Sequence, residues 1–139
     1  MVDKPLYAKT VAVIRDAVER VRAMLPASAE AFAADRTARE VVVLNLFVAI
    51  QAAIDLAARW LADEGWDVPQ RYGDLFTALA DHQVLSKELA RRLAEAVGFR
   101  NLVAHQYGVI DWARLHAMAT SSDLDDLERF CAELSTKLI

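Results

Sequence analysis

Apolar residues recur at helical spacing from the start of the chain. The first set consists of Val11, Ile14, Val18, Val21 and Leu25. Steps of three and four residues place these side chains on one stripe of an amphipathic helix, predicted over 6–25. Pro26 ends that helix, because its ring clashes inside a helix and disfavours helical geometry at Leu25. Ser28 can then cap a second helix.

The second predicted helix is long and almost wholly apolar in its middle. No proline or glycine occurs over 27–64, so one helix, bent near 36–40, is the simplest prediction. Within 41–54 only Asn45 and Gln51 are polar. This stretch is too short and too interrupted to cross a membrane, which takes about 20 apolar residues. A helix that is apolar all round needs cover on several sides, so part of its surface is expected to be a homodimer interface.

Shorter helices are predicted in the second half of the chain. Gly, Asp and Pro mark a loop over 65–72, which a short helix follows. Ser86 is a fair N-cap for the next helix, which runs through Gly98 and is expected to end at Gly108. A further turn or two is predicted from about 111, and a final helix over 123–138. The expected fold class is all-α: a single domain over 1–139, an antiparallel bundle of about five helices.

The composition fits a globular protein in a reducing compartment. Of 139 residues, 55% are apolar and 26% are charged, which argues against disorder. The single cysteine, Cys131, excludes an intrachain disulfide, and no signal-peptide pattern opens the chain, so a cytoplasmic location is expected. The net charge of −4 speaks against a general nucleic-acid coat protein. The adjacent Arg91 and Arg92 fit a solvated face, or alternatively a groove that tracks an RNA backbone.

The segment 100–107 concentrates groups that are able to do chemistry. Arg100 carries a permanent guanidinium, Asn101 an amide, His105 an imidazole and Tyr107 a phenol. On a helix with about 100° per residue, Asn101 and His105 lie on neighbouring positions of one face, whereas Arg100 and His105 lie roughly 140° apart. One straight helix therefore cannot bring Arg100 and His105 to a single phosphate.

Two arrangements would resolve this separation. The helix could end or distort near His105, or the arginine and histidine of two chains could meet across a two-fold axis. The apolar stretch over 41–54 already suggests a dimer, so the composite site is favoured. A structural interpretation is the alternative: Arg100 can cap a helix C-terminus, and His105 can be a hydrogen-bonded structural histidine.

No metal site is expected. Ser122, Asp123 and Asp125 resemble the metal-binding Ser-Asp-x-Asp of nucleotidyltransferases, but the upstream Gly-Ser turn and the β-sheet platform are missing. Ser122 as an N-cap, followed by acids in the first turn, is ordinary helix stabilisation. His82 and His116 have no partners at ligand spacing, and no P-loop or dinucleotide motif occurs, so no cofactor is expected either.

The motif and its surroundings resemble a known family. The pattern Arg-x4-His-x-Tyr within 99–107, followed by the segment 109–111, is similar to the signature of HEPN ribonucleases and in particular to HepT-like toxins. The segment 69–79 fits that family's loop and short helix, and 51–57 fits its long second helix. The resemblance covers about residues 40 to 135.

The resemblance implies a metal-independent endoribonuclease. Neutral His105 would take the proton from a ribose 2′-OH, whose oxygen attacks the adjacent phosphorus and leaves a 2′,3′-cyclic phosphate and a 5′-OH. Arg100 would stabilise the phosphoryl charge, and Asn101 would orient the ring or hold a phosphate oxygen. Because the nucleophile is a 2′-OH, DNA is not a substrate, while transfer RNA and messenger RNA both remain open.

Tyr107 is not needed by that chemistry. The resemblance implies that a partner antitoxin, a minimal nucleotidyltransferase of the MNT type, attaches AMP groups to Tyr107. Phosphates next to Arg100 would occupy its donors and repel RNA, which would silence the toxin. The alternative function is a non-catalytic helical accessory subunit of a nucleotidyltransferase.

Overall fold

Seven α-helices make up most of the chain that the computed structural model describes, residues 2–121 and 123–138. They are α1 Lys4–Met24, α2 Ala29–Ala34, α3 Arg36–Asp63, α4 Tyr72–Asp81, α5 Lys87–Gln106, α6 Trp112–Thr120 and α7 Asp125–Lys137, with a short 3-10 helix, η1, at Tyr107–Val109. No strand occurs among these described residues, and the predicted all-α class is confirmed. The helices outnumber the prediction chiefly because the long second helix is divided.

The prediction of a single helix over 27–64 is wrong, because the helix is interrupted at Asp35. The Asp35 backbone is extended (φ −105°, ψ 97°), which ends α2 after Ala34. Its side chain accepts a 3.0 Å hydrogen bond from the Ala38 amide and so caps α3. Aspartate favours such caps over helix interiors, because its carboxylate competes for nearby backbone amides. The break falls just before the predicted bend at 36–40.

Two serines begin helices as predicted. The Ala31 amide donates to the hydroxyl of Ser28 at 3.1 Å and starts α2. The Leu89 amide donates to the hydroxyl of Ser86 at 3.3 Å and starts α5. Each bond satisfies an amide that has no partner inside its own helix, so these short polar side chains fix where the helices begin.

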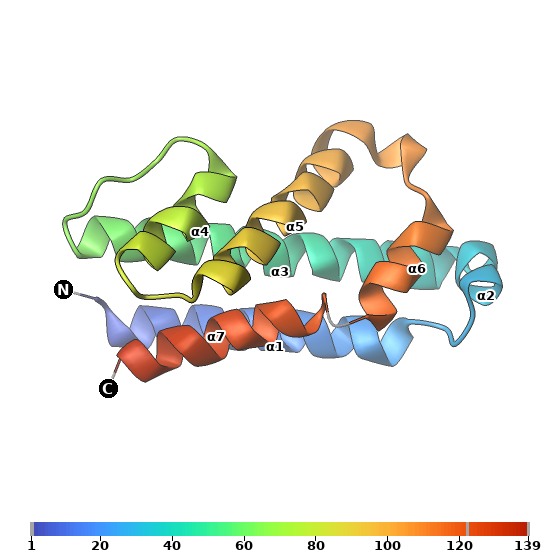
Figure 1. Cartoon of the computed structure of the whole chain (residues 1–139). Helices are drawn as coiled ribbons and strands as arrows, with labels where there is room; N and C mark the ends of the chain where they lie inside the picture. Colours follow the sequence, from blue (N-terminus) through green and yellow to red (C-terminus); the bar gives the residue numbers. More distant parts are fainter. Residues whose placement is uncertain (1, 122, 139) are drawn as a thin grey trace.

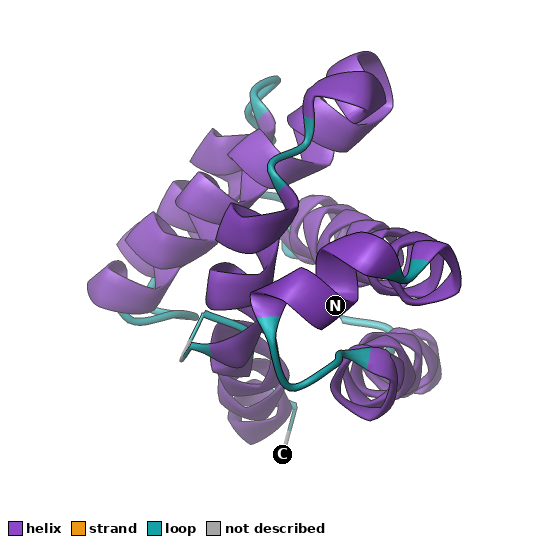
Figure 2. Cartoon of the chain, turned by 90° about the vertical axis from the view of Figure 1, so that its right-hand side faces the viewer, coloured by secondary structure: helices purple, strands orange, loops and turns teal. Residues whose placement is uncertain are grey.

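The central helix of the bundle is α3. Helices α1 and α7 pack on one side of it and α4 and α5 on the other, while α2 and α6 cover one end (Figure 1). In the view from that end, α3 runs nearly end-on, with other helices below it and to its left (Figure 2). By length and composition α3 could cross a membrane, yet half of its most apolar stretch is buried inside the fold. Its apolar character is therefore largely explained by its central position.

One face of α3 is only partly covered in the single chain. Its apolar members are Val41, Leu44, Val48 and Ala52, here named the α3 stripe. They are three or four residues apart and so share one side of the helix. Leu44 is 61% exposed, which is unusual for a leucine in a central helix. A homodimer interface on this stripe stays a prediction.

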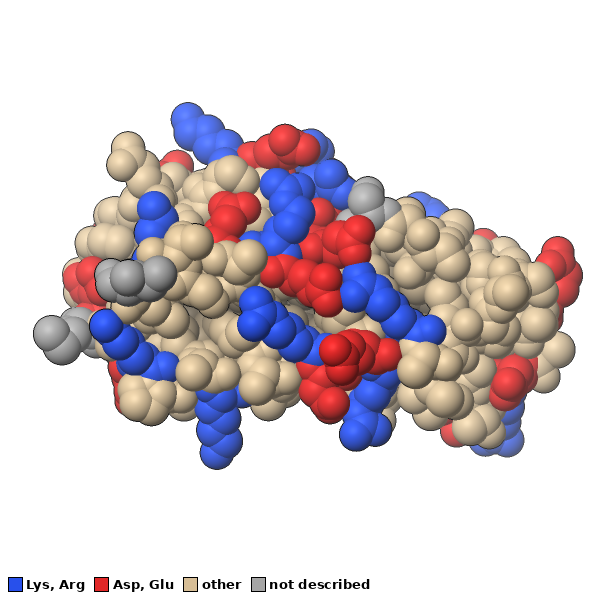
Figure 3. All heavy atoms as spheres, turned by 90° about the horizontal axis from the view of Figure 1, so that it is seen from below, with Lys and Arg blue, Asp and Glu red and all other residues tan. Residues whose placement is uncertain are grey.

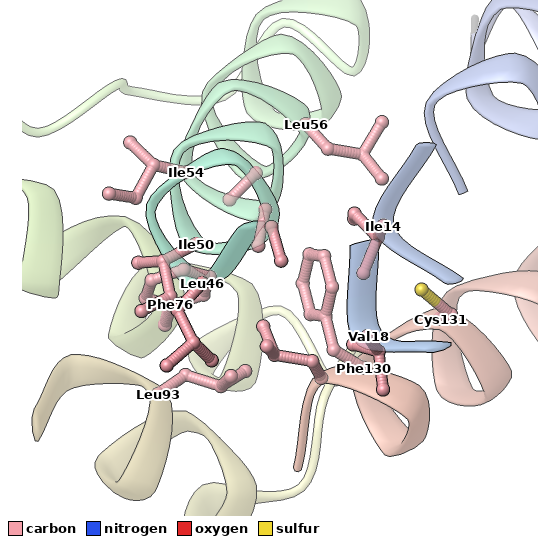
Figure 4. Close-up of a cluster of buried hydrophobic side chains, with 14 of the residues drawn as sticks. Ile14, Val18, Leu46, Ile50, Ile54, Leu56, Phe76, Leu93, Phe130 and Cys131 are labelled. Carbon is pink, nitrogen blue, oxygen red and sulfur yellow. The ribbon is translucent and has the colours of Figure 1, made fainter. Parts of the chain in front are cut away.

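Phe130 of α7 lies at the centre of the core, among side chains of α1, α3 and α5 (Figure 4). It is fully buried and meets the Phe76 ring edge to face at 5.7 Å.

Phe130→Ala is expected to lower the free energy of unfolding by about 3–5 kcal/mol, because it leaves a cavity that the helices cannot close. Urea denaturation measures this loss. The exposed Val13→Ala should cost less than about 0.5 kcal/mol, and a loss equally small for Phe130→Ala would contradict the packing.

Cys131, next to Phe130, is buried as well, and burial raises the pKa of its thiol from 9.0 to about 11. Since the thiolate is the reactive form, native protein should react with iodoacetamide at about pH 8 far more slowly than protein unfolded in urea. The unfolded chain loses this proton near pH 9 and the native chain only near pH 11, so the free energy of unfolding is expected to fall as pH rises through that window. Equal alkylation rates in native and unfolded protein would contradict the burial.

Candidate functional site

Arg100 lies on α5 and is held against α3 by a neutral partner. Its Nε donates a 2.7 Å hydrogen bond to Oε1 of Gln51, and its Nη1 donates a 3.2 Å bond to Oδ1 of Asn101. The guanidinium also lies over the rings of Phe47, at 5.4 Å, and Tyr72, at 5.1 Å. No carboxylate of the described residues forms an ion pair with Arg100. Its charge is therefore positioned but not neutralised, as an anion-binding group requires.

Gln51 is itself fixed by a third residue. Its Nε2 donates a 2.9 Å hydrogen bond to Oδ1 of Asp55, one turn along α3, which turns the amide oxygen toward Arg100. This role was not predicted from the sequence. The available indication was an amide in a largely apolar stretch, because a polar group there needs a hydrogen-bond partner.

His105 lies one turn after Asn101 on α5, so the predicted pair on one face is confirmed. It is exposed and forms no hydrogen bond or ring contact with any described residue. The interpretation of His105 as a hydrogen-bonded structural histidine is therefore wrong. Arg100 does not cap a helix C-terminus either, since its hydrogen bonds go to side chains.

The end of α5 does not bring His105 to Arg100. The helix continues through His105, and the backbone leaves helical geometry only at Gln106 (φ −141°, ψ 43°). Gly108 lies inside η1, so the C-cap predicted at Gly108 is wrong. Because the break follows His105, it does not change the angle of roughly 140° that five helical steps set between Arg100 and His105. Of the two predicted arrangements, the distorted helix does not solve the separation within one chain.

Tyr107 begins η1 directly after the break and is 44% exposed. Its ring meets the Trp112 ring edge to face at 6.1 Å, and the Arg39 guanidinium lies over the same indole at 5.0 Å. Arg36 has a raised pKa, mainly from its hydrogen bond and charge interaction with Glu40 and to a smaller extent from the nearby Tyr107 phenol. Arg39, near the start of α3, thus lies against the same indole as Tyr107, which the sequence did not predict.

The acids around 123–126 are paired with arginines. Asp123 and Asp126 bind the Arg92 guanidinium at 3.4 and 2.9 Å, and Asp125 pairs with Arg22. Burial raises the pKa of Asp126, although Arg92 opposes that effect. No group of three potential metal ligands lies together among the described residues; the predicted N-cap Ser122 lies outside them.

These pairs also remove the RNA groove that Arg91 and Arg92 could have formed. Arg92 is engaged by acids, and Arg91 pairs with Glu95 at 3.2 Å. The face formed by α1 and α7 interleaves acidic and basic side chains and has no continuous positive surface (Figure 3). The other histidines have structural contacts: His82 stacks on Trp66 with ring centroids 3.8 Å apart, and buried His116 bonds the Pro26 carbonyl at 2.7 Å.

A cavity of about 770 Å³ opens between α5, α6 and the start of α7, away from the motif side chains. Much of its wall is apolar, with Leu46, Phe99, Leu102 and Met118 among the lining residues. Arg100, Asn101, His105 and Tyr107 do not line it. The candidate site is therefore an open surface on α5 and η1, which suits a long polymeric ligand better than a small enclosed one.

Comparisons with known proteins agree with the motif. A family model described as Ribonuclease HepT-like matches residues 14–134. The mRNA nuclease HepT of Shewanella oneidensis is 28% identical over 120 residues, which cover 86% of this chain and 89% of that protein. The structure of the tri-AMPylated Shewanella oneidensis HEPN toxin in complex with MNT antitoxin matches with a TM-score of 0.86 and 26% identity, over 98% of this chain and 99% of that chain.

A more distant structure shares the fold alone. YutE of Bacillus subtilis, a cytosolic protein of unknown function, matches with a TM-score of 0.84 at 15% identity, over 99% of this chain and 91% of that chain. The resemblance found in the motif is confirmed by the family model, which spans most of the bundle. The chain belongs to the Ribonuclease HepT-like family.

Proposed function

We propose that this chain is the toxin of a HEPN/MNT toxin–antitoxin pair and acts as a metal-independent endoribonuclease. The observation that carries the proposal is Arg100, a guanidinium fixed by Gln51 and left without a carboxylate, in the same motif as the exposed His105. The related Shewanella protein named as an mRNA nuclease supports RNA as the substrate. The related toxin solved with its MNT antitoxin supports the partner.

In the proposed reaction His105 accepts the proton of a ribose 2′-OH. The 2′ oxygen forms a bond to the adjacent phosphorus, and the bond to the 5′ oxygen breaks as that oxygen takes up a proton. Arg100 donates to the phosphoryl oxygens as charge develops on them, while Asn101 orients the imidazole or holds a phosphate oxygen. General-base help of this kind typically contributes about 10² to 10⁴-fold.

The active unit in this proposal is a homodimer. Gln51, which anchors Arg100, lies three residues after Val48 and seven after Leu44, so it shares the face of the α3 stripe. A second chain that covers the stripe would come close to Arg100 and could supply His105 from its own α5. Val109, directly after the motif and 67% exposed, adds apolar surface beside the site.

Silencing in this proposal occurs at Tyr107, whose exposed phenol is the acceptor for AMP groups. The relative solved with MNT antitoxin is tri-AMPylated, which supports modification of this family of toxins. Tyr107 lies two residues after His105, so phosphates on it would repel RNA from the site.

The test is cleavage of RNA by the purified chain in the presence of EDTA. Products should carry a 2′,3′-cyclic phosphate and a 5′-OH, and a 2′-deoxy substitution at the cleaved position should block the cut. Cleavage that needs added magnesium would refute metal independence. RNA that stays intact while the chain binds its nucleotidyltransferase tightly would replace the proposal with the accessory-subunit function.

A further inference from the structure

Side chains from the start of α3 and from the segment after α5 meet at the Trp112 indole. Tyr107 and Arg39 both lie against the indole of Trp112, at 6.1 and 5.0 Å, and Arg36 interacts electrostatically with the phenol. Arg36, Arg39, Tyr107 and Trp112 are here named the Tyr107 cluster. Trp112 also packs edge to face on Phe32 of α2 at 5.9 Å, so the indole is anchored to the bundle and holds the cluster in place.

The two arginines are not explained by the stability of α3. Cationic side chains in the first turn of a helix are disfavoured by the helix dipole, and the acidic cap Asp35 precedes that turn, which itself holds no acidic residue. Arg36 pairs with Glu40 at 2.9 Å, but the two side chains are 83% and 55% exposed, and such pairs contribute little. The Nε of Arg39 is buried and has no hydrogen-bond partner among the described residues. A buried donor without an acceptor costs free energy, so this placement of Arg39 does not stabilise α3.

We propose that Arg36 and Arg39 bind the phosphates of the nucleotide groups carried by Tyr107. The inference rests on the proposed function, in which Tyr107 is the acceptor of AMP. In that transfer the Tyr107 oxygen forms a bond to the α-phosphorus of ATP, pyrophosphate leaves and the phenolic proton is released. The product carries a negative phosphodiester on the Tyr107 oxygen, and a guanidinium matches the phosphate oxygens in charge and geometry.

Arg39 extends the site to the next phosphate. Its guanidinium lies over the same indole that the Tyr107 ring contacts, so a second nucleotide attached to the first would meet a second cation. The phosphates are thereby held at the start of α3 and the nucleotides stay near His105 instead of moving freely in solvent. The Tyr107 cluster thus holds the attached nucleotides in one position, where they obstruct access of RNA to His105.

The test compares melting temperatures with and without AMPylation. The chain is modified by its purified MNT antitoxin with ATP, and intact mass spectrometry confirms the added groups. Modification should raise the melting temperature of the wild type by about 4 °C, since the new charge-assisted hydrogen bonds exist only in the folded state. The gain should vanish in the double variant Arg36→Ala, Arg39→Ala. The matched control Arg15→Ala, Arg20→Ala, at exposed positions of α1, should keep it.

The outcomes separate this inference from the proposed function. A wild type that takes up no AMP refutes Tyr107 silencing itself. An equal gain in melting temperature in the double variant refutes the phosphate site but leaves the proposed function standing. Loss of RNA cleavage in the unmodified double variant also refutes it, because the two arginines would then bind the RNA substrate. If the double variant takes up no AMP, the two proteins are instead titrated with free 5′-AMP. The nucleotide should shift the NMR signal of the Trp112 indole in the wild type but not in the double variant. Absence of a shift in the wild type would overturn the proposed phosphate site.

Discussion

Arg100→Ala and His105→Ala are each expected to reduce RNA cleavage by about 10² to 10⁴-fold, because in the proposed mechanism one removes the cation that stabilises the phosphoryl charge and the other removes the general base. Both residues lie outside the buried core, so melting temperatures should change little. Single-turnover cleavage and circular dichroism measure the two effects. Growth arrest on expression should disappear in parallel.

The control for these variants is Arg91→Ala. Arg91 lies on the same helix, is exposed and, among the residues that the structure describes, pairs with Glu95 one turn away. Its replacement should leave cleavage unchanged, which separates the loss of one specific cation from a general loss of positive charge. Cleavage at the wild-type rate in either Arg100→Ala or His105→Ala would contradict the catalytic role proposed for that residue.

Mixing the two inactive variants is expected to restore cleavage. If Arg100 of one chain acts with His105 of the other, a mixed dimer contains one complete site and one site that lacks both groups. Random exchange makes half of the dimers mixed, so about a quarter of the wild-type activity should return. The measurement is cleavage by the mixture after partial unfolding and refolding, against each variant alone.

A double variant provides the control for mixing. Arg100→Ala, His105→Ala in one chain, mixed with wild type, forms dimers without any complete site, so it should lower activity instead of restoring it. An action of Arg100 and His105 within one chain would leave the two single variants inactive in any mixture. That result would refute the composite site formed by two chains but would not contradict the ribonuclease function.

Features that rest on spacing and caps could be predicted from the sequence. The apolar stripe over 6–25 became α1, and Ser28 and Ser86 cap α2 and α5. Such features depend on residues within one or two turns, so local physics is sufficient. Asp35, like Ser28, has a short polar side chain that caps a helix. An N-cap predicted at Asp35 would have divided the long helix at the correct residue.

The surroundings of Arg100 could not be predicted in that way. Gln51 lies 49 positions earlier in the chain and reaches Arg100 only because α3 and α5 pack together. Tyr72 reaches the same guanidinium from the start of α4. The angular separation of Arg100 from His105, in contrast, follows from helical geometry alone, and the structure keeps both residues on one helix.

The neutral anchor of Arg100 has an evolutionary consequence. Both codons for glutamine become codons for glutamate through a single base change, and a carboxylate at position 51 would form an ion pair with Arg100 that occupies the donors meant for phosphate. Gln51→Glu should therefore disarm the toxin without unfolding it. Cells that survive expression of the chain are expected to carry Gln51→Glu among their suppressor mutations, and sequencing survivors checks this. A single oxygen in place of an NH₂ group at position 51 would then be enough to abolish the proposed toxicity.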